Sequence, residues 1–153
     1  MDKQSMINIA DIGESNLDYK DEVIYAVKEA ETYLSRFKWC RKIIDGWVAS
    51  SFGYILNILY YKILPDKISC SDEFLWIIVG DIPPAYIDIV SAPTAYDALE
   101  CYIDLMQEWV ENVMNGETVE DCYPLNVPPQ KEYAQMLDTR IRMLKEDFLP
   151  QIA

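Results

Sequence analysis

The sequence contains no histidine among its 153 residues. Histidine is the commonest metal ligand and the usual general base near neutral pH, so imidazole chemistry is excluded. The four cysteines, Cys40, Cys70, Cys101 and Cys122, are widely separated, whereas zinc sites usually contain a close cysteine pair. We therefore expect four free thiols in or near the core, and we predict no metal and no cofactor.

The sequence also lacks a long apolar segment and a secretion signal. The longest uncharged apolar run, residues 52–61, is about half the length that a membrane-spanning helix needs. The first sixteen residues have no basic start, no apolar stretch and no small-residue cleavage site. We expect a cytoplasmic protein with no membrane contact.

The composition is typical of a globular protein, with 51% hydrophobic and 25% charged residues. Four Trp, eleven Tyr and four Phe are too many aromatic residues for a disordered chain. The length fits one domain, and we find no repeat or linker, so we expect a single domain over residues 1–153.

The first predicted element is helical. Apolar residues recur at every third or fourth position over residues 23–44, which indicates an amphipathic helix. Ser15 and Asp18 have the spacing of a capping box, and Gly46 supplies a stop. We expect either one long helix or two helices joined near Trp39.

The middle of the chain predicts an antiparallel sheet of two to four strands. Residues 54–63 are rich in β-branched and aromatic side chains, and Gly53 before them indicates a bend or bulge. Residues 74–79 are apolar on both faces, as in a central strand covered on two sides. A short edge strand over residues 86–90 is expected after a break at Pro83-Pro84.

Two helices are predicted at the C-terminal end, which makes the fold class α+β. Thr94 and Asp97 form a second capping box, and Gly116 closes the helix that follows. The last helix carries an apolar stripe over residues 133–148 and is expected to end at Pro150.

Charge of one sign is missing from a long stretch of the chain. Residues 68–130 contain twelve acidic residues and no Lys or Arg, so they carry almost all of the net charge of −13. Nucleic-acid binding needs a basic patch and is therefore excluded, whereas an acidic surface can occupy the basic cleft of a nucleic-acid enzyme.

Five acidic residues recur every three or four positions in the helix after Thr94, opposite its apolar face. Like charges at this spacing repel each other, so the stripe costs stability in an isolated helix. It serves either solubility or the binding of a basic protein partner. The five residues are Asp97, Glu100, Asp104, Glu108 and Glu111.

A second candidate region begins where the apolar strand runs into Gly80-Asp81-Ile82-Pro83. Gly80 allows a sharp turn, and Asp81 can cap nearby backbone N–H groups, so a purely structural strand exit is one interpretation. In the other interpretation Asp81, Tyr86 and Asp88 meet a ligand at the edge of the sheet.

This region carries a family resemblance. A Trp-Cys pair near the first helix, a strand running into Gly-Asp-Leu-Pro-x-x-Tyr, and a proline-started helix containing Trp are similar to an uncharacterised bacterial family of unknown function. The resemblance implies a bacterial α+β domain and no particular activity. The matching positions are Trp39-Cys40, Trp47, Gly80-Asp81-Ile82-Pro83, Tyr86, Pro93 and Trp109, and Ile82 stands where the family has Leu.

Three classes of function follow from these observations. The first is a non-catalytic protein that binds a basic partner through its acidic face, such as an immunity-type or antitoxin-type inhibitor. The second is a structural or homo-oligomeric domain. The third is a carboxylate-based enzyme, for which Asp81, Tyr86 and Asp88 are the grouped candidates.

Overall fold

The computed structural model describes residues 6–66 and 72–152, so Cys70 lies outside it. The fold is α+β, as predicted, but the antiparallel sheet has five strands, in the order β1-β2-β3-β4-β5. The elements are β1 (Ile7–Asn8), the 3₁₀-helix η2 (Ile9–Glu14), α1 (Lys20–Leu34), β2 (Cys40–Phe52), β3 (Leu56–Pro65), β4 (Phe74–Gly80), β5 (Ile82–Asp88), α2 (Ala95–Met114), α3 (Lys131–Met143), the π-helical turn η3 (Leu144–Phe148) and α4 (Leu149–Ile152).

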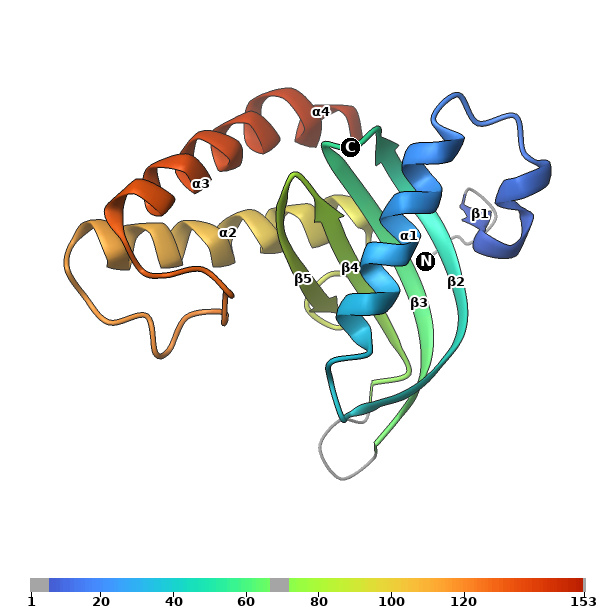
Figure 1. Cartoon of the computed structure of the whole chain (residues 1–153), viewed down its shortest axis with the longest axis horizontal. Helices are drawn as coiled ribbons and strands as arrows, with labels where there is room; N and C mark the ends of the chain where they lie inside the picture. Colours follow the sequence, from blue (N-terminus) through green and yellow to red (C-terminus); the bar gives the residue numbers. More distant parts are fainter. Residues whose placement is uncertain (1–5, 67–71, 153) are drawn as a thin grey trace.

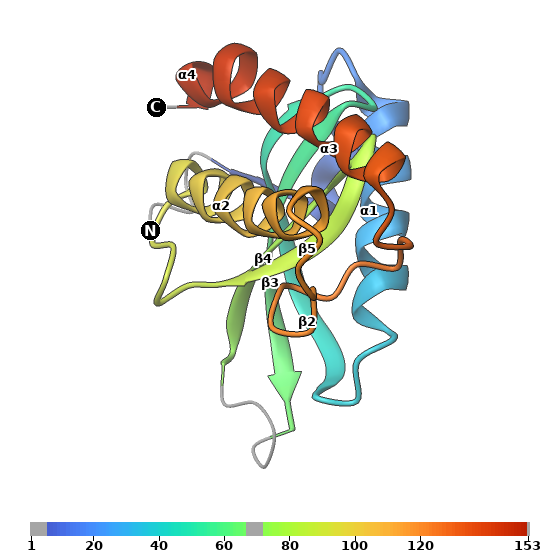
Figure 2. The ribbon, with the colours of Figure 1, turned by 90° about the vertical axis from the view of Figure 1, so that its left-hand side faces the viewer.

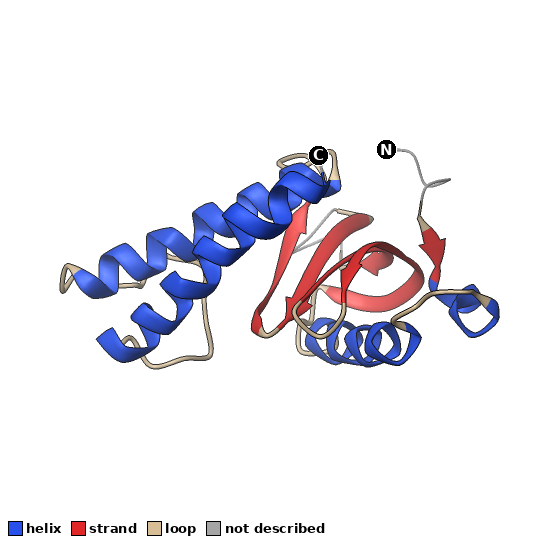
Figure 3. Ribbon diagram, turned by 90° about the horizontal axis from the view of Figure 1, so that it is seen from above, coloured by secondary structure: helices blue, strands red, loops and turns tan. Residues whose placement is uncertain are grey.

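Helices cover both faces of the sheet (Figure 1). Seen from above, α1 lies on one side of the strands, and α2 and α3 lie on the other (Figure 3). The paired α2 and α3 run side by side across the sheet (Figure 2) and project beyond β5 (Figure 1). Each covered face has its own core, which we call the α1-side core and the α2-side core.

β4 separates the two cores. Trp76 and Ile78 pack in the α2-side core, whereas Leu75, Ile77 and Val79 pack in the α1-side core, and none of the five is more than 2% exposed. The strand lies between β3 and β5 and pairs with β3 antiparallel. The predicted buried strand over 74–79 is therefore confirmed, and each of its large side chains contributes about 1.5–3 kcal/mol through burial.

The predicted helix over residues 23–44 is wrong in its second half. α1 ends at Leu34, and β2 begins at Cys40. The pairing of β2 with β3 is shifted at three places, as expected where β-bulges insert extra residues. In the first half of β2, Cys40 and Ile44 continue the helical spacing of apolar residues, but they share no buried face, because Ile44 is 47% exposed.

The bend at Gly53 is the turn between β2 and β3, with φ at +62°. Asn57, a buried polar residue, donates from Nδ2 to the Gly53 carbonyl oxygen at 2.9 Å. The Ser51 hydroxyl donates to Asn57 Oδ1 at 2.6 Å. These bonds satisfy the buried amide and fix the hairpin.

Three other predicted boundaries of helices and strands are wrong. Ser15 does not cap α1; its hydroxyl donates to the Ile12 carbonyl oxygen at the end of η2. Pro83 and Pro84 do not break the strand but lie within β5, where an edge position tolerates the missing N–H groups. Pro150 does not end the last helix, because η3 precedes it and leaves it in the first turn of α4.

α2 begins and ends as the sequence predicted. The Asp97 N–H donates to Thr94 Oγ1 at 3.2 Å, which makes Thr94 the N-cap, and Gly116 follows the helix with φ at +72°. Over the described ranges, no helix is long and apolar enough to cross a membrane.

Candidate functional site

α2 presents the predicted acidic stripe on its outer surface. On the inner side Leu99, Tyr102 and Met106 are completely buried, and Trp109 is 2% exposed. Of the five acidic residues, Asp97 is half-buried and the other four are exposed. We call these five residues the acidic face: Asp97, Glu100, Asp104, Glu108 and Glu111.

Asp88, the last residue of β5, adds its charge to the acidic face. The pKa of the Cys101 thiol is raised first by burial and then by the carboxylates of Asp104, Asp88 and other members of the acidic face. Asp88 also accepts two hydrogen bonds from Ser91, from its N–H at 2.7 Å and from its hydroxyl at 3.0 Å. Its carboxylate therefore fixes the turn after β5 and strengthens the negative field over the start of α2.

No cation of the described residues forms an ion pair with the acidic face. The two ion pairs within 6–66 and 72–152 are Arg140–Asp81 at 3.2 Å and Arg142–Asp138 at 3.0 Å. Both involve carboxylates outside the acidic face. The electrostatic field over the acidic face is therefore negative, because no described Lys or Arg forms an ion pair with its carboxylates.

Asp81 lies at the opposite end of β5 from Asp88 and binds α3. Arg140 donates from Nη2 to Asp81 Oδ2 at 3.2 Å and from Nε to the Asp81 carbonyl oxygen at 2.8 Å. The Asp81 side chain is 72% exposed, so this pair stabilises the fold by no more than about 1 kcal/mol. Asp81 thus has a structural contact that joins the sheet to α3.

Gly80, the residue before Asp81, lies where no side chain fits. Its φ is +150°, and a Cβ atom there would lie 2.1 Å from the Ile55 carbonyl oxygen. The same carbonyl oxygen accepts a hydrogen bond from the Asp81 N–H at 3.0 Å. The Gly80 N–H donates to Glu29 Oε1 at 3.2 Å; burial raises the pKa of Glu29, and this bond offsets part of that effect.

Tyr86 belongs to an aromatic cluster on the α1 side of β5. Its ring lies 5.2 Å from Phe37, 5.0 Å from Trp39 and 5.6 Å from Tyr123, measured between ring centroids. The hydroxyls of Tyr123 and Tyr33 share a hydrogen bond at 2.5 Å. Burial raises the pKa of both phenols, which therefore remain neutral at physiological pH.

Tyrosine hydroxyls and prolines close the free edge of β5. The Tyr86 N–H donates to the Tyr123 hydroxyl at 3.1 Å, and the Tyr102 hydroxyl donates to the Pro83 carbonyl oxygen at 2.6 Å. Pro83 and Pro84 have no N–H to offer. Few backbone groups are therefore left for a further strand at this edge.

The structure does not gather Asp81, Tyr86 and Asp88 into one site. Asp81 and Asp88 are separated by the whole of β5, roughly 20 Å of extended strand. Tyr86 packs with aromatic rings between them. Among the described residues, no group of three or more His, Cys, Asp or Glu side chains could hold a metal ion.

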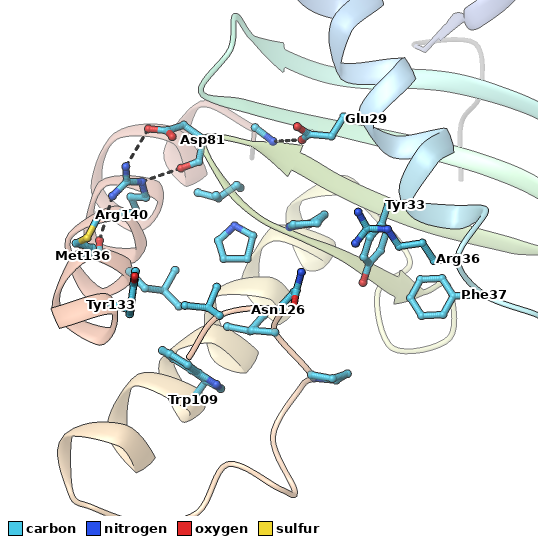
Figure 4. Close-up of a pocket in the computed structure, with 18 residues that line it drawn as sticks. Glu29, Tyr33, Arg36, Phe37, Asp81, Trp109, Asn126, Tyr133, Met136 and Arg140 are labelled. Carbon is cyan, nitrogen blue, oxygen red and sulfur yellow. Dashed lines mark hydrogen bonds and ion pairs between the residues drawn. The ribbon is translucent and has the colours of Figure 1, made fainter. Parts of the chain in front are cut away.

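A cavity of about 700 Å³ lies beside the start of β5, and sequence analysis missed it (Figure 4). Its walls come from α1, β5, α2, α3 and the loop over residues 124–127, so no local pattern marks it. The Gly80-Asp81 segment, on its rim, is the part of the wall that the sequence singled out. Among the lining residues are Arg36, Phe37, Pro83, Pro84, Trp109 and Leu137.

Three of the four cysteines can be placed, and all three are free thiols: Cys40, Cys101 and Cys122. The pKa of Cys122, like that of Cys101, is raised first by burial and then by nearby carboxylates. A raised pKa lowers the thiolate fraction, so these two thiols are poor nucleophiles.

Comparison with known protein families places the chain in a family of unknown function. The family model described as "Domain of unknown function (DUF4826)" matches residues 58–147, more than half of the chain. The match confirms the resemblance to a family of unknown function and includes Gly80 to Tyr86, Pro93 and Trp109. Trp39-Cys40 and Trp47 lie outside the matched range. No curated protein and no solved structure matches.

Proposed function

We propose that this chain, which belongs to the DUF4826 family of unknown function, is a non-catalytic binding protein whose acidic face receives a basic protein partner. The observation that carries the proposal is the exposed acidic face, which has no ion pair with any described cation. Its most concrete form is an immunity-type or antitoxin-type inhibitor that covers the basic cleft of a toxin or nuclease in the bacterial cytoplasm.

The arrangement of charges on α2 supports this proposal energetically. Glu100 and Asp104, and then Asp104 and Glu108, are like-charged pairs at i,i+4, which destabilise a helix by about 0.2–0.5 kcal/mol each. Glu108 and Glu111 lie near the C-terminal end, where the helix dipole disfavours anions. A basic partner removes both penalties, and the long-range field accelerates its approach.

The test is charge reversal with a matched control. The triple variant D104K/E108K/E111K reverses most of the acidic face at exposed positions. The variant D11K/E14K/D18K makes the same change in net charge at exposed positions in and after η2, on the far side of the sheet from α2 (Figure 1). Each tagged protein is used to capture partners from lysate of the source organism at low and high salt, and association rates are then measured with the purified partner.

The proposal predicts that wild type captures a basic partner at low salt and loses it at high salt. The variant D104K/E108K/E111K, which we call the α2 variant, should fail to capture this partner. The variant D11K/E14K/D18K, which we call the η2 variant, should retain it. Exposed charges are screened over about 10 Å at 0.1 M salt, so the association rate should fall steeply as salt increases. Equal capture by all three proteins would reduce the acidic face to a solubility feature.

A structural or homo-oligomeric role is the alternative, and the same variants separate it. Self-association through the acidic face brings like charges together, so it would strengthen at high salt or in the α2 variant. Sedimentation velocity of the three proteins measures this directly. A carboxylate enzyme has less support, because the grouped candidates Asp81, Tyr86 and Asp88 do not converge.

A further inference from the structure

We infer that the cavity beside β5 is a binding site for a small hydrophobic carboxylate. Its volume of about 700 Å³ falls within the range of about 300–1,000 Å³ that small-molecule sites occupy. The site lies at the β5 edge, between α1 and α3, and does not include any residue of the acidic face.

The body of the ligand must be apolar because most of the cavity wall is apolar. Pro83 and Pro84 contribute ring carbons and no N–H groups. Trp109 and Leu137 line it from α2 and α3, and Phe37 lines it from the loop after α1. Polar groups placed against these carbons would lose their water without gaining partners, which is costly.

The charged end of the ligand is set by Arg36. Figure 4 shows the Arg36 guanidinium beside Tyr33 on the cavity wall, and it forms no ion pair with another described residue. The other cation that lines the cavity, Arg140, already holds Asp81 through two hydrogen bonds. Arg36 is therefore the group with donors available to an anion.

Charge, rather than geometry, favours a carboxylate over a phosphate at this cation. One planar guanidinium binds two oxygens of either anion in the same fork geometry. Glu29 and Asp81 also line the cavity, and the chain carries a net charge of −13. These negative charges oppose a second charge on the ligand, so a monoanion is favoured.

The test compares two probes of similar shape, naphthoate and naphthylmethanol, by isothermal titration calorimetry with the full chain. Arg36→Gln removes the cation at an exposed position just after α1, and Lys28→Gln removes an exposed cation of α1 that does not line the cavity. Asn126→Trp places a large side chain in the cavity from an exposed loop position (Figure 4).

Wild type and Lys28→Gln should bind naphthoate about tenfold more tightly than naphthylmethanol, the value of one charge-assisted hydrogen bond. Arg36→Gln should remove this preference by weakening the binding of naphthoate alone. Asn126→Trp should weaken the binding of both probes. Failure of wild type to bind naphthoate would overturn the inference. So would a preference that survives Arg36→Gln, or binding of both probes that Asn126→Trp leaves unchanged.

Discussion

Replacing Gly80 with alanine should destabilise the protein far more than a single methyl group suggests. The added Cβ would lie 2.1 Å from the Ile55 carbonyl oxygen and 2.6 Å from its carbon. Both are backbone atoms of the turn that leads into β3, so neither can move aside as a flexible side chain would. The φ of +150° is a second penalty, since residues with a Cβ rarely adopt it.

The magnitude follows from three contributions. Backbone strain at an unfavourable φ costs about 1–3 kcal/mol. Forcing extra volume into a packed site costs about 1–3 kcal/mol. The shift of the Ile55 carbonyl weakens its hydrogen bond from the Asp81 N–H, worth about 0.5–1.5 kcal/mol. Together they predict a loss of about 2.5–7.5 kcal/mol, a large share of the roughly 5–15 kcal/mol that stabilises a typical domain.

Gly116→Ala is the matched control. Gly116 also has a positive φ, +72°, but no atom lies within 4 Å of the point that a Cβ would occupy, so only the backbone penalty of about 1–2 kcal/mol applies. The free energy of unfolding is measured for both variants by urea titration followed by tryptophan fluorescence. Equal losses in the two variants would refute the argument that the Ile55 carbonyl closes this position.

Three further substitutions probe other parts of the structure. Trp109→Ala should cost about 3–5 kcal/mol in urea unfolding, because the ring is 2% exposed in the α2-side core; a loss below about 1 kcal/mol would contradict its packed position. Burial raises the pKa of Glu29 in the folded state, so the folded protein holds the Glu29 proton more tightly than the unfolded chain does. The stability gained from this protonation is present at low pH and is lost as the pH rises through the folded pKa. Glu29→Gln should therefore be more stable than wild type at neutral pH and lose that advantage below the ordinary pKa of 4.5; an advantage independent of pH would exclude titration as the cause. Tyr123→Phe should cost about 1–3 kcal/mol in thermal or urea unfolding, because it leaves the Tyr86 N–H without its hydroxyl partner; an unchanged midpoint would show that water replaces the hydroxyl.

The elements that could be predicted are those whose pattern is set by burial alone. β4 is apolar on both faces because helices cover both faces of the sheet, and the periodicity of α2 follows from packing one face on the α2-side core. The cap at Thr94 is local chemistry and could also be predicted. The exposure of the acidic face follows from the same helical phase.

The elements that could not be predicted depend on strand pairing and on distant residues. The bulges in β2 are visible only against β3, and without β3 its spacing resembles a helix. β1 has two residues, too few for a periodic signal. The cavity joins residues from Glu29 to Arg140, so only the tertiary structure creates it.

The closed edge of β5 limits how copies of this sheet can assemble. A fibril grows when each chain offers two free strand edges, one to the chain before it and one to the chain after it. Here Pro83, Pro84 and the tyrosine hydroxyls occupy one of those edges. Strand pairing between copies is then left to the opposite edge, formed by β1 and the part of β2 that β1 does not cover, and such a symmetric contact ends at two chains. Repeated strand addition at both edges of this sheet is therefore disfavoured.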